Sequence, residues 1–262
     1  MPDTQQSLAD GYRRLKGVCG VLRVSVVDAA PVSGPGREWL CVAELSGGIG
    51  LLIEAEARRI GAEHGCVAPP HVAASRLLHH YLWSACLLIS GPWYLDGRVS
   101  WLRPEDVWIE VGSGDLAVRP ADGREVCGER EGAGEEGLRA ELRAAVAAHV
   151  APVLEAFRPV VKRGDRALWG MVTDDLVSGI WYLGRMLGEE ERAVAEATDL
   201  LPGGPAPFAG GAGFRRLPGT EGRSHLTRTR LGCCLYYTIR PADTCVTCPR
   251  TGDAERVLRL EA

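Results

Sequence analysis

Four cysteines near the carboxyl end constrain the fold of this chain more than any other feature. Within CCLYYTIRPADTCVTCPR, Cys233 and Cys234 are adjacent, ten residues follow, and Cys245 and Cys248 form a Cys-x-x-Cys pair. A Cys-x-x-Cys turn lets two thiolates converge on one metal centre, and a second pair that returns to it completes a four-thiolate site. Such sites hold zinc or an iron-sulfur cluster, so this segment is expected to fold around one of the two.

The adjacency of Cys233 and Cys234 distinguishes between these two metal centres. Neighbouring side chains tend to point apart, especially in extended backbone, so bringing both thiolates to one tetrahedral zinc would strain the chain. A cluster with two irons offers separated ligand positions. The pattern therefore favours a 2Fe-2S cluster, while a zinc-stabilised, non-redox binding protein stays open as the alternative.

The complete cysteine pattern resembles the carboxy-terminal signature of the FhuF-like ferric siderophore reductases. It reads C-C-x10-C-x2-C and is followed by Pro249 and Arg250. Two apolar stretches agree with the resemblance: residues 166–184 (RALWGMVTDDLVSGIWYLG) are similar to the central Leu-Trp-Gly helix of that family, and residues 72–91 to its earlier Ser-containing helix. The family often has Asn directly after Leu-Trp-Gly, where this chain has Met171.

The resemblance implies a function for the cysteine segment. It implies that Cys233, Cys234, Cys245 and Cys248 hold a 2Fe-2S cluster, which passes one electron to a ferric siderophore of the hydroxamate type and so releases ferrous iron. This would make the protein an oxidoreductase. A 2Fe-2S electron carrier or a redox sensor that signals to a protein partner is the alternative that keeps the cluster but binds no siderophore.

Arginines outnumber carboxylates in sequence around the cysteines. Their excess charge would favour the reduced cluster and would attract an acidic electron donor such as a ferredoxin or a flavodoxin. The residues expected to contact the substrate or the donor are Trp169, Arg228, Arg230 and Tyr236. Arginines near the motif include Arg223, Arg228, Arg230, Arg240 and Arg250, opposed by Glu221, Asp243 and Asp253.

Composition excludes some classes of protein. With 262 residues, 46% of them hydrophobic and 24% charged, the chain has the mixture of a globular protein with one large core or two modest lobes. A net charge of −4, without a dense Lys/Arg block, argues against nucleic-acid binding. The amino terminus lacks the apolar stretch of a secretory signal, and the apolar region 77–95 is interrupted by His79, His80, Gly91 and Pro92. A cytoplasmic protein without an integral membrane segment is expected.

Hydrophobic periodicity predicts an α+β protein that is mostly helical, with a small β-sheet in the amino-terminal part and an irregular carboxy-terminal iron-sulfur unit. Three parts are expected: an α+β lobe at 1–125, a helical lobe with a Gly/Pro-rich tether at 126–222, and the cluster-binding unit at 223–262. The remaining cysteines, which are expected to be core or surface residues rather than ligands, are Cys19, Cys41, Cys66, Cys86 and Cys127.

Individual elements follow from the same patterns. Strands are predicted at 21–29 and 37–45, paired as a hairpin or as neighbours across a Pro/Gly turn, and short strands at 107–111 and 116–118. Residues 121–137 are predicted to be a surface loop and 202–222 to lack regular structure. Asp174 and Asp175 are expected at solvated helix positions. Helices are predicted at 51–65, 70–90, 138–157, 165–187 and 189–200.

Overall fold

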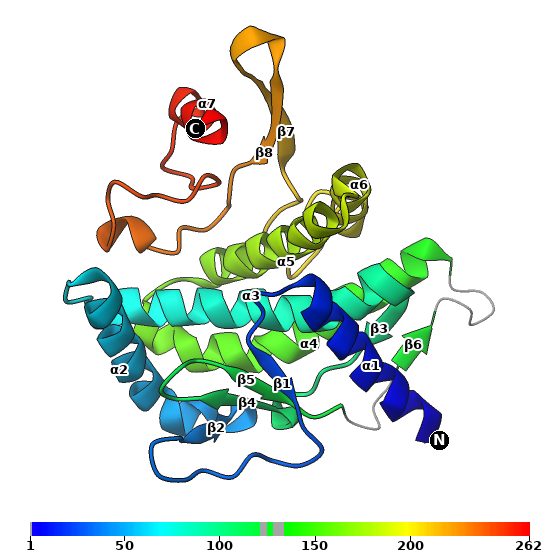
Figure 1. The fold of residues 1–262 in the computed structure, drawn as a ribbon, viewed down its shortest axis with the longest axis vertical. Coiled ribbons are helices and arrows are strands. Elements are labelled where there is room, and N and C mark those ends of the chain that lie inside the picture. Colours follow the sequence, from blue (N-terminus) through cyan, green and yellow to red (C-terminus); the bar gives the residue numbers. More distant parts are fainter. Residues whose placement is uncertain (1, 121–124, 128–133) are drawn as a thin grey trace.

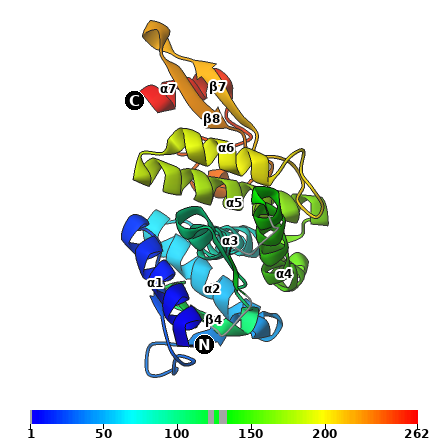
Figure 2. The same cartoon turned by 90° about the vertical axis from the view of Figure 1, so that its right-hand side faces the viewer.

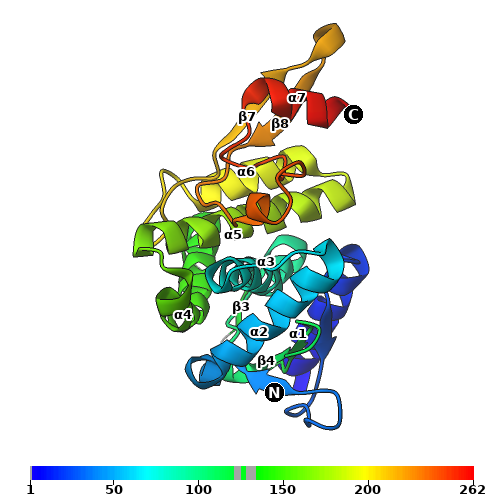
Figure 3. The same cartoon turned by 90° about the vertical axis from the view of Figure 1, so that its left-hand side faces the viewer.

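A helical body carries a small sheet at one end and the cysteine segment at the other in the computed structural model (Figure 1). The structure describes residues 2–120, 125–127 and 134–262, with the side chains of 8–120 and 134–262. The two termini lie at opposite ends of the long axis in all three views (Figures 2 and 3). The cysteine segment is thus carried on the far side of the helices from the sheet.

Helix α3 (Pro70–Asp96) is the centre of the body. It is apolar nearly all round, and such a helix must be covered on every side; it packs against α1, α2, α4 and α5. The helix continues through Gly91 and Pro92, beyond its predicted end. A Cβ at position 91 would lie 2.7 Å from Leu15 Cδ1, so glycine permits the close approach of α1. The other helices of the body are α1 (Pro2–Val18), α2 (Leu45–His64), α4 (Glu135–Val161), α5 (Asp165–Leu187) and α6 (Glu190–Leu200).

The four-stranded sheet has the order β1-β5-β4-β2. The first two strands were predicted to pair as a hairpin or to lie as neighbours, and this prediction is wrong, because β1 and β2 form opposite edges of the sheet. Strands β4 and β5 are buried at every position and meet through a tight turn, so they take the middle of the sheet. Strand β1 pairs with β5 in parallel and β2 with β4 antiparallel. The strands are β1 (Val24–Val26), β2 (Trp39–Cys41), β4 (Val107–Glu110) and β5 (Leu116–Val118).

Two smaller sheets complete the fold. Strand β3 (Arg98–Ser100) pairs with β6 (Glu125–Cys127), so part of the predicted loop at 121–137 is a strand, while 121–124 and 128–133 lie outside the described residues. The side chain of Cys127 is also outside the description. A hairpin of β7 (Phe214–Pro218) and β8 (Ser224–Arg228) then leads into the cysteine segment, which ends in helix α7 (Asp253–Glu261). The tether at 202–222 is therefore only partly irregular.

The predicted fold class is confirmed: the chain is mostly helical, with a small mixed sheet in its amino-terminal half and a two-stranded sheet near its carboxyl end. Helix α5 has the predicted bounds, and α2 begins earlier than predicted, at Leu45. Helices α1 and α7 were not predicted.

Helix α4 is long and apolar enough to cross a membrane by length and composition, as core helices of globular proteins also are. In this structure 44% of its most apolar window is buried inside the fold.

A buried histidine couples the stability of this body to pH. The His149 ring donates from Nδ1 to the Leu102 carbonyl (2.9 Å) and accepts at Nε2 from the Tyr81 hydroxyl (2.7 Å). Burial lowers the pKa of His149 to about 4. The unfolded chain binds a proton below about pH 6.5, whereas the folded protein binds it only near pH 4. Stability is therefore lost as the pH falls between these values.

We expect the free energy of unfolding to decrease by up to about 3 kcal/mol from this group alone between pH 6.5 and 4. Urea unfolding at pH 7 and at pH 4.5 measures the change. The His149→Gln variant, which keeps one donor and one acceptor, should show a smaller loss of stability over the same interval. An equal loss in both proteins would show that another group causes the pH dependence.

Candidate metal centre

The structure brings the four predicted cysteine ligands together. Cys233, Cys234, Cys245 and Cys248 line one small cavity of about 10 Å³ beneath Tyr237. All four are free thiols; Cys234 and Cys248 are buried, and the other two are half-buried. Cys19, Cys41, Cys66 and Cys86 do not line this cavity. Among the described side chains no three His, Cys, Asp or Glu residues are arranged to hold a single metal ion.

Local backbone geometry sets the direction of these cysteine side chains. Leu235 has a φ of 65°, a left-handed conformation that is uncommon for a residue with a branched side chain. The turn that it makes lets its N–H donate to the thiol of Cys233. At the other pair, Cys248 N–H donates to the Cys245 carbonyl at 2.9 Å, which closes the Cys-x-x-Cys turn. Both turns fold the two pairs toward one another.

The thiols differ in their electrostatic surroundings. A hydrogen bond from Cys245 lowers the pKa of the Cys234 thiol, against the effect of burial, and nearby positive charge from His79, Arg76 and Arg230 lowers it further. Donating that hydrogen bond raises the pKa of Cys245. Burial raises the pKa of Cys233, while Arg163 opposes the rise. Cationic side chains thus approach the cysteines from two sides.

Asp174, in the middle of α5, binds the backbone just before the cysteines. Its carboxylate accepts the N–H of Leu231 at Oδ1 (2.9 Å) and that of Gly232 at Oδ2 (2.7 Å). The side chain is fully buried and forms an ion pair with Arg228 at 2.6 Å. Burial raises the pKa of Asp174 and lowers that of Arg228, and the ion pair opposes both shifts. The cysteine segment is therefore anchored to the helical body through one carboxylate.

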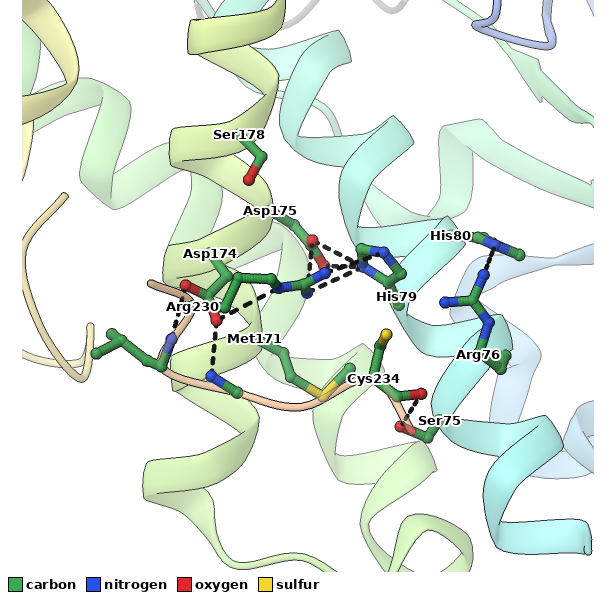
Figure 4. Close-up of polar contacts among 12 residues, drawn as sticks. Ser75, Arg76, His79, His80, Met171, Asp174, Asp175, Ser178, Arg230 and Cys234 are labelled. Carbon is green, nitrogen blue, oxygen red and sulfur yellow. Dashed lines mark hydrogen bonds and ion pairs between the residues drawn. The ribbon is translucent and has the colours of Figure 1, made fainter. Parts of the chain in front are cut away.

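Asp175, the next residue of α5, holds a second set of contacts (Figure 4). It accepts a hydrogen bond from Nδ1 of His79 (2.8 Å to Oδ1) and pairs with Arg230 at 3.2 Å. With Nδ1 donating to Asp175, His79 Nε2 can accept from Arg230 Nη1 at 3.2 Å. Figure 4 shows the sulfur of Cys234 pointing toward His79, and the carbonyl of Cys234 accepts from Ser75 Oγ at 3.4 Å. Helix α3 thus contacts Cys234 directly, while α5 holds the residues that come just before the first cysteine pair.

A close approach between loop and helix makes these contacts possible. A Cβ at Gly232 would lie 3.0 Å from Met171 Cγ and 3.4 Å from Met171 N, so a larger residue would push the loop away from α5. The glycine of the Leu-Trp-Gly sequence, Gly170, faces the same loop, because a Cβ there would lie 3.4 Å from the Leu231 Cβ. Two glycines therefore bring the loop within hydrogen-bond reach of Asp174.

Comparison with known families assigns the cysteine segment. Residues 230–250 match the family model described as the FhuF 2Fe-2S C-terminal domain. We refer to residues 230–250 as the FhuF domain, after the family model that they match. The match begins at Arg230, takes in all four cysteines and ends at Arg250, so the resemblance seen in the sequence is confirmed for this part of the chain. No curated protein matches the chain.

The donor set of the FhuF domain fits the cluster that its family implies. A 2Fe-2S cluster takes four thiolates, two on each iron. Among the described residues, four thiols and no competing carboxylate or imidazole line the small cavity of this domain. The residues that would hold the cluster are Cys233, Cys234, Cys245 and Cys248.

Arg256 of α7 supports the second cysteine pair from behind, a contact that the sequence did not suggest. It is 1% exposed and donates to the carbonyls of Val246 (2.7 Å), Cys248 (2.9 Å) and Thr251 (3.1 Å). A guanidinium has five donors in a fixed fork, so one side chain can hold several carbonyls of a turn at once. The last helix of the chain therefore fixes the shape of the Cys-x-x-Cys turn.

We expect Arg256→Met to destabilise the FhuF domain by about 2–3 kcal/mol, because three buried carbonyls lose their donor while the apolar stem is kept. Hydrogen exchange of the 245–251 amides and the rate of iron loss to a chelator measure the effect; both should increase. The control is Arg250→Met, since Arg250 is exposed and contacts the Tyr237 ring at 4.2 Å. Equal rates of iron loss in the two variants would mean that α7 does not support the turn.

The four predicted contact residues occupy different places. Trp169 packs edge-on against Phe208, with ring centroids 5.8 Å apart, and Arg228 is fully buried beside Asp174. Neither lines a described cavity next to the cysteines. Arg230 and Tyr236 line both the cysteine cavity and a larger cavity beside it. Of the four predicted residues, these two therefore lie where a small molecule bound in the larger cavity could approach the cysteines.

Proposed function

We propose that this protein is a cytoplasmic ferric siderophore reductase, with a hydroxamate-type complex as its substrate. The observation that carries the proposal is the match of residues 230–250 to the FhuF 2Fe-2S domain, in which four thiols line one cavity. The cavity next to it, of about 710 Å³, has the size of a site for a small-molecule ligand and favours a reductase over a protein that only carries electrons.

The chemistry required is the transfer of one electron. When bound, a 2Fe-2S cluster accepts a single electron and gives it up again. Hydroxamate oxygens are hard ligands that hold ferric iron tightly and ferrous iron poorly, so adding one electron to the substrate iron releases it. In total, an external donor gives one electron, the electron passes through the FhuF domain to Fe(III) of the substrate, and the iron leaves as Fe(II). No protein nucleophile or general base takes part.

The residues around the cysteines support this step by position and charge. Asp174 and Asp175 fix the domain on α5, and Ser75 and His79 place α3 against Cys234. Most arginines near the motif are neutralised by carboxylates: Arg228 by Asp174, Arg230 by Asp175 and Arg240 by Asp243. The local positive charge is thus smaller than the sequence suggests.

An acidic electron donor, such as a ferredoxin or a flavodoxin, is proposed to approach on the side of Cys233. Arg163 acts on the Cys233 thiol electrostatically, and Lys162, Arg166 and Arg250 are exposed. Complementary charge steers such encounters and makes their rates depend on ionic strength. Reduction of the protein by the donor should therefore become slower as salt is added.

One experiment tests the function. The protein is purified without oxygen, its iron and sulfide are quantified, its visible and electron paramagnetic resonance spectra are recorded, and the reduced form is mixed with a ferric trihydroxamate. We expect a 2Fe-2S spectrum that is reoxidised by the ferric complex, with one ferrous ion trapped by a chelator per electron. A stable reduced spectrum after mixing would contradict the reductase and favour a carrier or sensor. A colourless zinc protein would contradict both.

A further inference from the structure

The larger cavity lies directly against the FhuF domain. Its volume is about 710 Å³, and its walls come from α2, α3, the β4–β5 turn, Arg230 and the short turn Tyr236–Thr238. Its rim is open to solvent: the side chains of Arg23 and Glu63 are 77% and 74% exposed. Cavities of 300–1,000 Å³ with apolar walls and a few placed polar groups are typical of small-molecule sites.

We propose that this cavity is the binding site of the ferric siderophore, with Arg76 holding the oxygen ligands of the iron. The proposal rests on the proposed function and adds to it a location and a positioning residue. It is carried by three features: the shared wall with the cysteines, the charge of the lining, and the unusual surroundings of Arg76.

The shared wall brings a bound molecule close to the cysteines. Arg230 and Tyr236 line both cavities, so a layer one side chain thick separates them. His79 lines the larger cavity on one side and acts electrostatically on the Cys234 thiol on the other. A reductase must place the acceptor atom beside its cofactor, and of the described cavities of useful size this one shares residues with the cysteine cavity.

The charges of the lining nearly cancel. Arg59 pairs with Glu56 at 2.7 Å and Arg230 with Asp175 at 3.2 Å, while Arg23 lies 3.8 Å from Asp115. Glu63 adds one exposed carboxylate at the rim. A nearly neutral lining suits an uncharged or weakly charged complex, which a ferric trihydroxamate is, and provides little attraction for a multiply charged anion.

Arg76 is the cation of the lining that contacts no carboxylate among the described residues. Its guanidinium lies over the Tyr236 ring, 4.8 Å from the centroid, and donates to Nε2 of His80 at 2.7 Å. A guanidinium has only donors, so the Nε2 of the His80 ring accepts this hydrogen bond. Figure 4 shows Arg76 and His80 together on α3, beside His79. The remaining Arg76 donors are available to a ligand.

The position of Arg76 affects electron transfer to the substrate as well as binding of the substrate. One added electron converts an uncharged ferric trihydroxamate into a ferrous complex with one negative charge. A guanidinium beside the oxygen ligands stabilises that new charge more than it stabilises the uncharged ferric complex. Arg76 therefore favours the product side of the electron transfer, and the apolar parts of Ile60, Leu77, Trp83 and Tyr236 cover the organic frame of the ligand.

Binding is tested without electron transfer by using the uncharged gallium(III) complex of the cyclic trihydroxamate desferrioxamine E, because gallium(III) is not reduced under these conditions. Isothermal titration calorimetry gives its Kd for the wild-type protein and for Arg76→Gln, in which we expect binding to be weaker by about tenfold or more. Ser113→Trp, at an exposed position of the rim, should block binding without disturbing the core. The matched control is Arg58→Gln, an exposed arginine of α2 that does not line the cavity.

Reoxidation of the reduced protein separates this proposal from the proposed function. With the ferric complex as oxidant, Arg76→Gln and Ser113→Trp should react more slowly than wild type, whereas ferricyanide should oxidise all three at the same rate. Unchanged gallium binding in both variants, with normal reduction of the ferric complex, would overturn the site and keep the reductase. Gallium binding that both variants lose, with no reduction of the ferric complex by wild type, would support the site and overturn the reductase. No binding and no reduction would overturn both.

Discussion

Replacing Asp174 with Asn is expected to lower the free energy of unfolding by about 3–5 kcal/mol and to release the cysteine segment from α5, although the two side chains have the same shape. Arg228 is fully buried and would keep its charge without its carboxylate partner. One carboxylate oxygen would also become an amide N–H₂ group that faces the N–H of Leu231 or of Gly232. Two donors would then point at each other in a buried place.

Urea unfolding measures the loss of stability, and hydrogen exchange of the Leu231 and Gly232 amides measures the release of the loop. The control is Asp165→Asn, because Asp165 is in the same helix and pairs with Arg158 at 2.8 Å, but its side chain is 67% exposed. Exposed pairs contribute little, so its loss should cost less than about 1 kcal/mol. Similar losses in the two variants would mean that Asp174 does not anchor the cysteine segment.

The fold could be predicted where hydrophobic periodicity determines it. Helix α5 was predicted with its observed bounds, since its apolar residues repeat with helical spacing and Gly188 follows it. The pairing of β1 with β5 could not be predicted, because it joins residues about ninety positions apart and a local turn suggested a simpler partner. Helix α7 was missed because it is short and mostly polar, and its role depends on one buried arginine.

The candidate site likewise has features that the sequence could predict and features that it could not. The four cysteines could be predicted as ligands from their spacing, which reflects metal-ligand geometry within one short segment, and the structure places all four around one cavity. Asp174 and Asp175 were predicted to be solvated, and this prediction was wrong: both are fully buried. Every residue from Gly170 to Val177 is buried, and Val172, Leu176 and Val177 surround the two aspartates; this local apolar run was the available sign that no face of α5 meets solvent at this point.

The larger cavity shows the limit of reading a sequence without its fold. Its walls come from α2, α3, a turn of the sheet and the FhuF domain, so no short stretch of sequence carries its pattern. His79 and His80 are neighbours in the chain, yet one contacts Asp175 and the other accepts from Arg76. Sequence reasoning treated this histidine pair as an interruption of an apolar helix. The structure shows instead that both rings line a cavity next to the cysteines.

Replacing Cys245 with Ser is expected to remove most of the iron and sulfide from the purified protein and to slow reduction of a ferric trihydroxamate by at least about 100-fold. A serine hydroxyl is a hard, weakly acidic ligand that does not substitute well for a thiolate on iron. Iron and sulfide analysis, the visible spectrum and single-turnover kinetics measure the loss. If the proposed site is right, the gallium(III) complex should still bind, because Cys245 lines the small cavity and not the larger one.

The control for this substitution is Cys66→Ser. Cys66 is a half-buried free thiol that does not line the cysteine cavity, so the variant should keep its iron, its spectrum and its rate. A Cys245→Ser protein with full iron and sulfide and a normal rate would remove Cys245 from the ligand set. Full cluster content with a shifted spectrum and a slow rate would show instead that serine replaces the thiolate as a ligand. Cys245 would then hold the cluster as proposed, and its sulfur would matter for the rate of electron transfer rather than for assembly.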